Sequence, residues 1–321
     1  MKIKKLMAVV GVGIMALTGC STGTNQVGDS QGANTEITSE QTTNEQASTK
    51  ENGKETKEES SKEAMRIVSG TVSATQVLDK LETDLVGVPQ TKYTLPARYD
   101  GLPLVGQAMS PDFETIVSLD SDLVVIDSMF KENVEKSMEE FGLNAFYFNT
   151  STYSNFLLSI EELGKAIGKE DKANELIGTF KEVEEEIRSE AKEEAPTVAI
   201  LFGGGENFML ATDNSYLGDL VNTVGAKNIT DDLNIESDYI PFSMEQIVAS
   251  NPDYILRFAH GNLEETKKAF DQAFDKNPAF KTLKAVQEGR VIDLDPNVFG
   301  VSANIYIVDA LGALGEIFYG E

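Results

Sequence analysis

The sequence contains one cysteine, one histidine and no tryptophan in 321 residues. A single cysteine allows no disulfide within the chain, and a single histidine excludes zinc or manganese sites built from several imidazoles. The Gly-rich residues 203–207 lack the Lys-Ser/Thr of a phosphate loop and the spacing of a dinucleotide motif, which favours a plain turn. No nucleophile elbow occurs, and no spacing of acids singles out a catalytic pair. We therefore expect no enzyme; an exported enzyme that works through carboxylates is the alternative.

Basic residues are also scarce, since 27 Lys and Arg stand against 53 Asp and Glu, for a net charge of −26. Most of this excess lies C-terminal to residue 64. Such a surface repels phosphate backbones and anionic lipid. We therefore exclude nucleic acid and an anionic membrane surface as partners.

The N-terminus has the pattern of a secretory signal. Lys2, Lys4 and Lys5 precede the apolar stretch 6–17, which is too short for a stable transmembrane helix. The residues before Cys20 resemble a bacterial lipobox, in which the cysteine is acylated and becomes the mature N-terminus. Ordinary signal cleavage beside an incidental cysteine is the alternative. We expect a signal peptide over residues 1–19 and a protein on the outer face of the cell membrane, held there by its lipid alone.

Residues 20–64 comprise Cys20 and a segment of Ser, Thr, Gln, Asn, Glu and Lys without aromatic residues. A segment of this composition cannot bury enough apolar surface to offset its ordering entropy, so we interpret it as a disordered tether. Hydrophobic alternation begins at Met65, and the rest of the chain is long enough for two lobes.

An internal repeat organises the folded part. Residues 113–126 align with residues 244–257, and each copy reads as a short helix beginning near a Glu, a polar turn ending in Asp, and an apolar strand. The spacing from Glu to Asp is eight residues in both copies. Strands that alternate with helices indicate α/β lobes with mostly parallel sheets, and a single duplication predicts two similar lobes.

We place the lobes at residues 65–168 and 196–321. Residues 153–167 are predicted to form a helix, and apolar positions at three- and four-residue steps predict a longer one over about 170–194. A helix of that length could run between two lobes, so residues 169–195 are interpreted as a connector. An ordinary helix within one lobe is the alternative.

His260 and Met109 are the candidate ligand-binding side chains. His260 follows a strand-like run and precedes a helical one, and turns at strand ends are common places for ligand contacts. Met109 lies in a loop bounded by Gly106 and Pro111, away from any apolar helix face. Imidazole and thioether form the axial pair of His/Met haem proteins. A histidine without a ligand and a methionine that fills the core are the alternatives.

Five motifs closely resemble the haem-binding lipoproteins of Gram-positive iron-regulated surface determinant systems (the IsdE type), which serve ABC haem importers. The motifs occur at residues 94–99, 106–111, 211–221, 255–261 and 299–304, and the resemblance spans about Ile67 to Tyr319. It implies two Rossmann-like lobes joined by one long helix, as in class III substrate-binding proteins, with haem as the transported ligand.

The resemblance also implies roles for individual residues. The axial ligands of the haem iron fall on Met109 and His260, and the backbone that contacts the propionates falls on Thr71 and Val72. A Tyr-Lys pair of the family appears here in the order Lys92-Tyr93, so those two side chains are weaker candidates for the propionates.

The broader class of iron-complex and cobalamin binding proteins meets permease arginines with one surface carboxylate per lobe, and by position these are Glu114 and Glu245. The alternative is that both acids simply favour a helix N-terminus. The resemblance implies a monomer that receives haem from a cell-surface donor and delivers it to an ABC permease. A ferric-siderophore or cobalamin binding protein of the same fold is the alternative function.

Overall fold

The structure, a computed structural model, describes residues 64–191, 193–204, 207–260 and 263–320. These residues belong to one compact unit, Ser61–Glu321. The expected signal peptide, Cys20 and tether lie outside the described residues. No helix within the described part is both long and apolar enough to span a bilayer.

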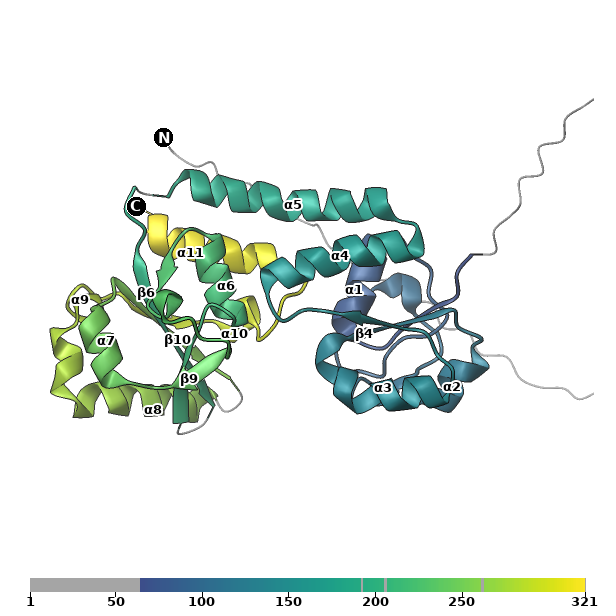
Figure 1. The fold of residues 1–321 in the computed structure, drawn as a ribbon, viewed down its shortest axis with the longest axis horizontal. Helices are drawn as coiled ribbons and strands as arrows, with labels where there is room; N and C mark the ends of the chain where they lie inside the picture. The colour runs from purple at the N-terminus through teal and green to yellow at the C-terminus, as the bar shows by residue number, and fades with distance from the viewer. Residues whose placement is uncertain (1–63, 192, 205–206, 261–262, 321) are drawn as a thin grey trace, which may run out of the picture. The chain divides into compact units, whose positions relative to one another are not determined.

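A three-stranded parallel sheet forms the centre of the N-terminal lobe (Figure 1). Its strands, in spatial order, are β1 (Ile67–Ser69), β4 (Leu123–Asp127) and β5 (Ala145–Phe148). Helices α1 (Val72–Lys80) and α4 (Tyr153–Ile167) pack with Val125, whereas α2 (Phe113–Ser118) and α3 (Lys131–Glu140) pack with Val124 and Ile126. The strand thus has both faces buried, as its continuous apolar sequence predicts.

A six-stranded sheet forms the C-terminal lobe in the order β11-β10-β6-β7-β9, with β8 also paired to β6. Its strands are β6 (Thr197–Gly204), β7 (Asn207–Ala211), β8 (Lys227–Asn228), β9 (Tyr239–Pro241), β10 (Tyr254–Ala259) and β11 (Val291–Leu294). β7 and β9 run antiparallel to their neighbours, and the other pairs are parallel.

Helices cover this second sheet on both faces. The longer ones are α6 (Tyr216–Thr223), α7 (Met244–Ser250), α8 (Leu263–Lys276) and α11 (Ile307–Tyr319), with the short α9 (Lys284–Gln287) and α10 (Pro296–Phe299). Leu256 and Phe258 of β10 pack with α6 and α11, whereas Ile255 packs with Phe270 of α8 and Ile247 of α7. Short 3₁₀ turns are η1 (Ala97–Tyr99), η2 (Ser128–Phe130), η3 (Asp231–Leu233) and η4 (Pro278–Thr282).

The long helix α5 (Glu170–Ser189) packs against both α4 and α11 (Figure 1). Ala173, Phe180 and Ile187 are buried along one stripe and belong to a core cluster that takes in residues of both sheets. The helix ends five residues before the predicted Glu194. Acidic side chains at 190, 193 and 194 oppose the negative C-terminal end of a helix, which favours the earlier end.

The two copies of the repeat adopt the same local structure. Asp112 caps α2 by accepting the N–H of Thr115, and Ser243 caps α7 in the same way by accepting the N–H of Gln246. Asp120 and Asn251 stand at equivalent positions and both have positive φ, 50° and 41°, a conformation that Asp and Asn tolerate best among side-chain-bearing residues.

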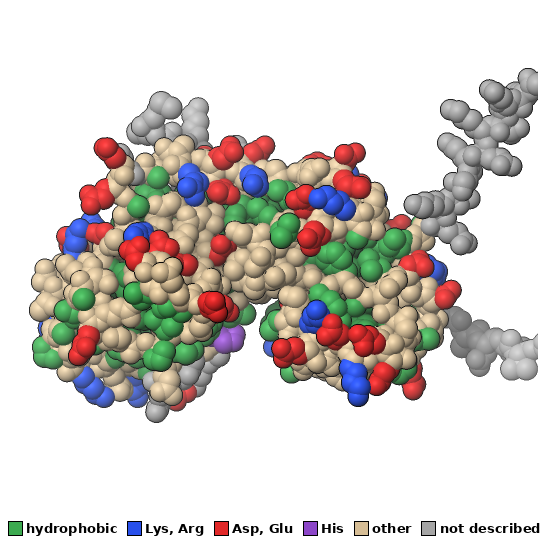
Figure 2. Space-filling model, viewed as in Figure 1, with side chains coloured by type: hydrophobic (Ala, Val, Ile, Leu, Met, Phe, Trp, Pro, Cys, Tyr) green, Lys and Arg blue, Asp and Glu red, His purple; other side chains and the backbone are tan. Residues whose placement is uncertain are grey.

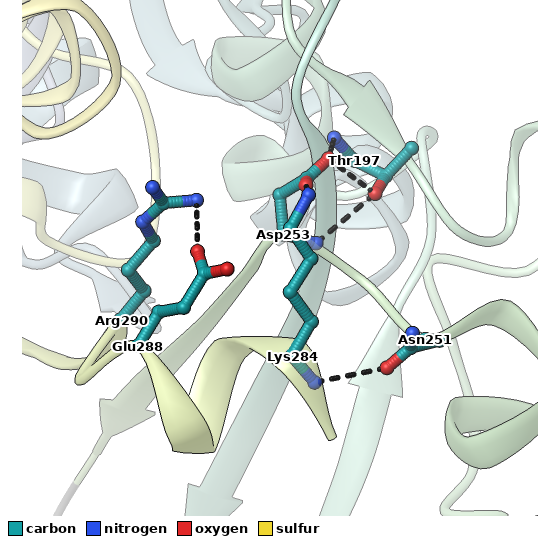
Figure 3. A network of polar contacts seen from close by, with 6 residues as sticks. All are labelled: Thr197, Asn251, Asp253, Lys284, Glu288 and Arg290. Atoms are coloured by element: carbon teal, nitrogen blue, oxygen red, sulfur yellow. Dashed lines mark hydrogen bonds and ion pairs between the residues drawn. The ribbon is translucent and has the colours of Figure 1, made fainter. Parts of the chain in front are cut away.

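The repeated aspartates serve as strand clamps. Asp122 accepts the N–H of Arg66, just before β1, at 2.7 Å. Asp253 accepts the N–H of Thr197, at the start of β6, at 2.9 Å, and it also binds the Thr197 hydroxyl and the Lys284 ammonium (Figure 3). Each aspartate therefore ties its own strand, β4 or β10, to the parallel neighbour, and this structural role explains the constant spacing in the repeat.

Candidate ligand-binding site

The N-terminus of α1 supplies one wall of the candidate site. β1 runs through Gly70 into Thr71, whose buried hydroxyl accepts the N–H of Ala74 at 3.4 Å and caps the helix. The first N–H groups of a helix have no partner within it, and they favour anionic ligands. Thr71 and Val72 are therefore placed where a ligand carboxylate could be bound by backbone groups.

Met109 lies at the tip of a small hairpin. β2 (Gly106–Gln107) and β3 (Ser110–Pro111) pair antiparallel, which leaves Ala108 and Met109 as the turn. Gly106 has φ 83°, and a Cβ there would lie 2.6 Å from the backbone nitrogen of Asp112, so the tight turn requires glycine. The Met109 side chain is 69% exposed, which rules out a core role.

A cavity of about 380 Å³ opens beside the helix start and the hairpin. Its described lining consists of Thr71, Val72, Ser73, Pro89, Gln90, Thr91, Tyr93, Ala108, Asp127, Met129, Phe130 and Ser302. This volume is in the range of small-molecule sites. A hollow of about 420 Å³ on α8 has a charged lining that includes Glu265, Lys268 and Lys276, and it contains none of the expected site residues.

The described lining of the cavity beside α1 contains no Lys or Arg. Tyr93 lines it, but Lys92 does not; the Lys92 ammonium lies 5.5 Å from the centre of the Tyr93 ring. Burial raises the pKa of the Asp127 carboxyl, while hydrogen bonds from Thr150 and from the Met129 N–H oppose that rise. Any anion bound here would rely on neutral donors rather than on a cationic side chain.

His260 follows β10 and is exposed (Figure 2). Its N–H donates to the Gly203 carbonyl at 2.8 Å, which continues the pairing with β6, and its ring lies 6.2 Å from the Phe202 ring. The imidazole is therefore on the surface, where a ligand could reach it. His260 is not among the residues that line the cavity beside α1.

Arg257, in the same motif as His260, has a structural role. Its guanidinium forms ion pairs with Asp293 at 2.7 Å and Asp271 at 2.9 Å, and it stacks over Phe270 and Phe274. It fastens β10 to β11 and α8, and so fixes the strand that carries the imidazole.

Glu114 and Glu245 are both exposed and stand at the second residue of α2 and of α7. Acids at a helix N-terminus are stabilised there by roughly 0.3–1 kcal/mol. Both acids therefore have the same local setting. This setting agrees with a role in permease docking and equally with a role limited to stabilising the helix N-terminus.

Asp127, Met129 and Ser302 line the cavity but were not predicted as site residues. A signal for Met129 was present in the repeat: Met129 stands seven residues after Asp122, and His260 stands seven residues after Asp253. Extending the aligned segments by three residues would have paired them. Within the described residues, no group of three or more His, Cys, Asp or Glu side chains is placed to hold a metal ion.

Comparisons with known proteins agree with this architecture. Residues 67–298 match the model of the family described as periplasmic binding protein. The chain is 30% identical over 324 residues to the high-affinity heme uptake system protein IsdE of Staphylococcus aureus strain MRSA252, covering 100% of this chain and 99% of that one.

Similar solved structures include the following two. An ABC transporter substrate-binding protein from Listeria monocytogenes EGD-e has a TM-score of 0.71 and 32% identity, covering 80% of this chain and 99% of that one. S. aureus IsdE complexed with heme has a TM-score of 0.66 and 34% identity, covering 79% and 99%. The chain thus belongs to the periplasmic binding protein family, with the class III fold, and is a substrate-binding protein rather than an enzyme.

Proposed function

We propose that this protein binds haem between its two lobes and delivers it to an ABC permease. The observation that carries the proposal is a cavity of about 380 Å³ at the start of α1, which Thr71 and Val72 line together with Ala108, the chain neighbour of the exposed Met109. Met109 would ligate the iron on one face and His260 on the other, as the axial pair of a His/Met haem site.

The haem propionates would be bound at Thr71 and Val72 by the N–H groups of the helix start. This arrangement suits the cavity because its described lining has no Lys or Arg. Tyr93 would contact the porphyrin edge, whereas Lys92 would act only through its contact with the Tyr93 ring. The similarity to S. aureus IsdE, a heme uptake protein whose structure with heme is among the similar ones, supports the choice of ligand.

The proposal extends to location and partners. The signal over residues 1–19 would be removed, Cys20 would be acylated, and residues 20–64 would tether the lobes 65–168 and 196–321 to the outer face of the membrane. Helix α5 within residues 169–195 would act as a stiff connector, because it packs on helices of both lobes. Glu114 and Glu245 would meet the permease, and an upstream surface protein would supply haem to the monomer.

Absorption spectra of the haem-loaded protein test the axial pair. We expect a saturable one-to-one complex, low-spin when the haem is ferrous, since a soft thioether favours ferrous iron. His260→Ala should give a high-spin spectrum or weak binding. A His260→Ala protein that binds haem with an unchanged low-spin spectrum would contradict the assignment.

A further inference from the structure

Met129 is an exposed thioether whose place in the fold corresponds to that of His260. β4 and β10 are the equivalent strands of the repeat, and the two side chains follow them at the same distance from the clamping aspartates. Met129 is 70% exposed, although burial of a methionine side chain is favourable.

The Met129 side chain lies at the cavity beside α1. Met129 is part of the described lining, as is Ala108, the neighbour of Met109 in the hairpin turn. Met129 of η2 thus lines the cavity, whereas Met109 is not in the described lining but follows Ala108 in the hairpin turn. Neither thioether is buried in the core, so core packing accounts for neither of them.

The backbone under Met129 is held firmly although its side chain is exposed. Asp127, itself 5% exposed, accepts the N–H of Met129 at 2.9 Å and the hydroxyl of Thr150. The Thr150 carbonyl in turn accepts the N–H of Ala303 at 2.9 Å, next to Ser302 in the cavity wall. A buried carboxylate with two donors thus fixes the turn that presents the thioether.

We propose that Met129 is a second thioether ligand for the haem iron, able to occupy the axial position opposite His260 in place of Met109. The inference rests on the proposed haem binding. The equivalent ends of the two duplicated strands would then supply the two axial ligands, and Met109 and Met129 would be alternative partners of the same imidazole. Two exchangeable soft ligands would let one bond break while another forms, which suits a carrier that must release its cargo.

The test uses Leu in place of Met, because this change removes the sulfur and nearly conserves side-chain volume. Met109→Leu, Met129→Leu and the double variant would be loaded with haem and reduced, and their spin state and the rate of haem transfer to an excess of apomyoglobin would be measured. Met65→Leu serves as the matched control, because Met65 is also exposed and precedes β1.

We expect Met109→Leu to keep a substantial low-spin fraction, and the double variant to lose it and to release haem at least about tenfold faster than either single variant. Low-spin iron that survives Met109→Leu but is lost in Met129→Leu would make Met129 the ligand and would overturn its exchange with Met109. The proposal is also overturned if Met109→Leu is already as high-spin as the double variant, or if Met129→Leu changes affinity without changing the spin state in the Met109→Leu background. Failure of the parent protein to bind haem would instead refute the proposed function itself.

Discussion

At the scale of single residues, folding strongly affects the ionisation of Asp213. Burial, together with the neighbouring Asp231 carboxyl, raises its pKa to about 6, against the opposing hydrogen bonds of Asn222 and Asn228. Because the ordinary value is near 4, the folded state holds a proton between about pH 4 and pH 6 that the unfolded state releases. The free energy of unfolding therefore falls as pH rises through this window.

Asp213→Asn should remove this dependence. We expect the variant to be more stable than the parent at pH 7.5 by about 1 kcal/mol, a reduced figure because the carboxyl is partly exposed to solvent screening. The difference should nearly vanish below about pH 3, where Asp213 is mostly protonated in both the folded and the unfolded state. Urea unfolding at the two pH values checks this, with the exposed Asp275→Asn as control, and an equal stability difference at both would contradict it.

Site residues were predictable where they were chemically unusual. His260 stood out as the one histidine, and Met109 as a methionine in a polar loop, and the structure places both at the surface. Met129 did not stand out, because Ile126-Asp127-Ser128-Met129-Phe130 reads as the end of an apolar strand. Only its folding into η2, after the Asp127 cap, turns that side chain outward.

At the scale of elements, α4 and α5 pack closely through a glycine. A Cβ on Gly164 would lie 2.5 Å from the Cβ of Ala173, whereas a Cβ on Gly178 of α5 would meet nothing within 4 Å. Gly164→Ala must therefore push the two helices apart, while Gly178→Ala removes only the conformational freedom that glycine gives the unfolded chain.

We expect Gly178→Ala to raise the free energy of unfolding by about 0.5–1 kcal/mol and Gly164→Ala to lower it by about 1–3 kcal/mol. Chemical denaturation of the two variants beside the parent measures both. The opposite order of stabilities would show that α5 does not pack on α4 through this contact.

The helices and strands were largely predictable from the sequence. Whether neighbouring strands run parallel or antiparallel was less so. The helix over residues 153–167 has the predicted bounds, because its apolar period and its capping Thr152 agree. The repeat correctly predicted the helix-turn-strand units of α2–β4 and α7–β10. The antiparallel strands β7 and β9 were not foreseen: β7 follows β6 along the chain without a crossover helix, and such a direct connection makes neighbouring strands antiparallel.

At the scale of the whole molecule, the two acids at equivalent positions of the repeat should control docking to the permease and leave haem binding unaffected. Replacing Glu114 and Glu245 together with Ala should abolish permease-dependent haem uptake while the dissociation constant for haem changes less than about threefold, since neither acid lines the cavity beside α1. The pair Glu182→Ala/Glu185→Ala, also exposed, makes the same change in net charge on α5.

Docking is measured as haem uptake by cells or proteoliposomes that contain the cognate permease. Haem binding is measured as the affinity of the purified variants. A similar loss of uptake in the α5 control pair would assign the effect to net charge. Weakened haem affinity in the Glu114/Glu245 variant would refute the separation of docking from binding.

The most direct test of haem carriage is calorimetric titration of the purified apoprotein with haem, a ferric tris-catecholate siderophore and cobalamin in parallel. The account predicts saturable one-to-one binding of haem and at least about 100-fold weaker binding of the other two. The cavity beside α1 supports this, because no Lys or Arg among its described lining residues could offset the charge of a ferric catecholate. Saturable binding of the siderophore or of cobalamin, without saturable binding of haem, would contradict it.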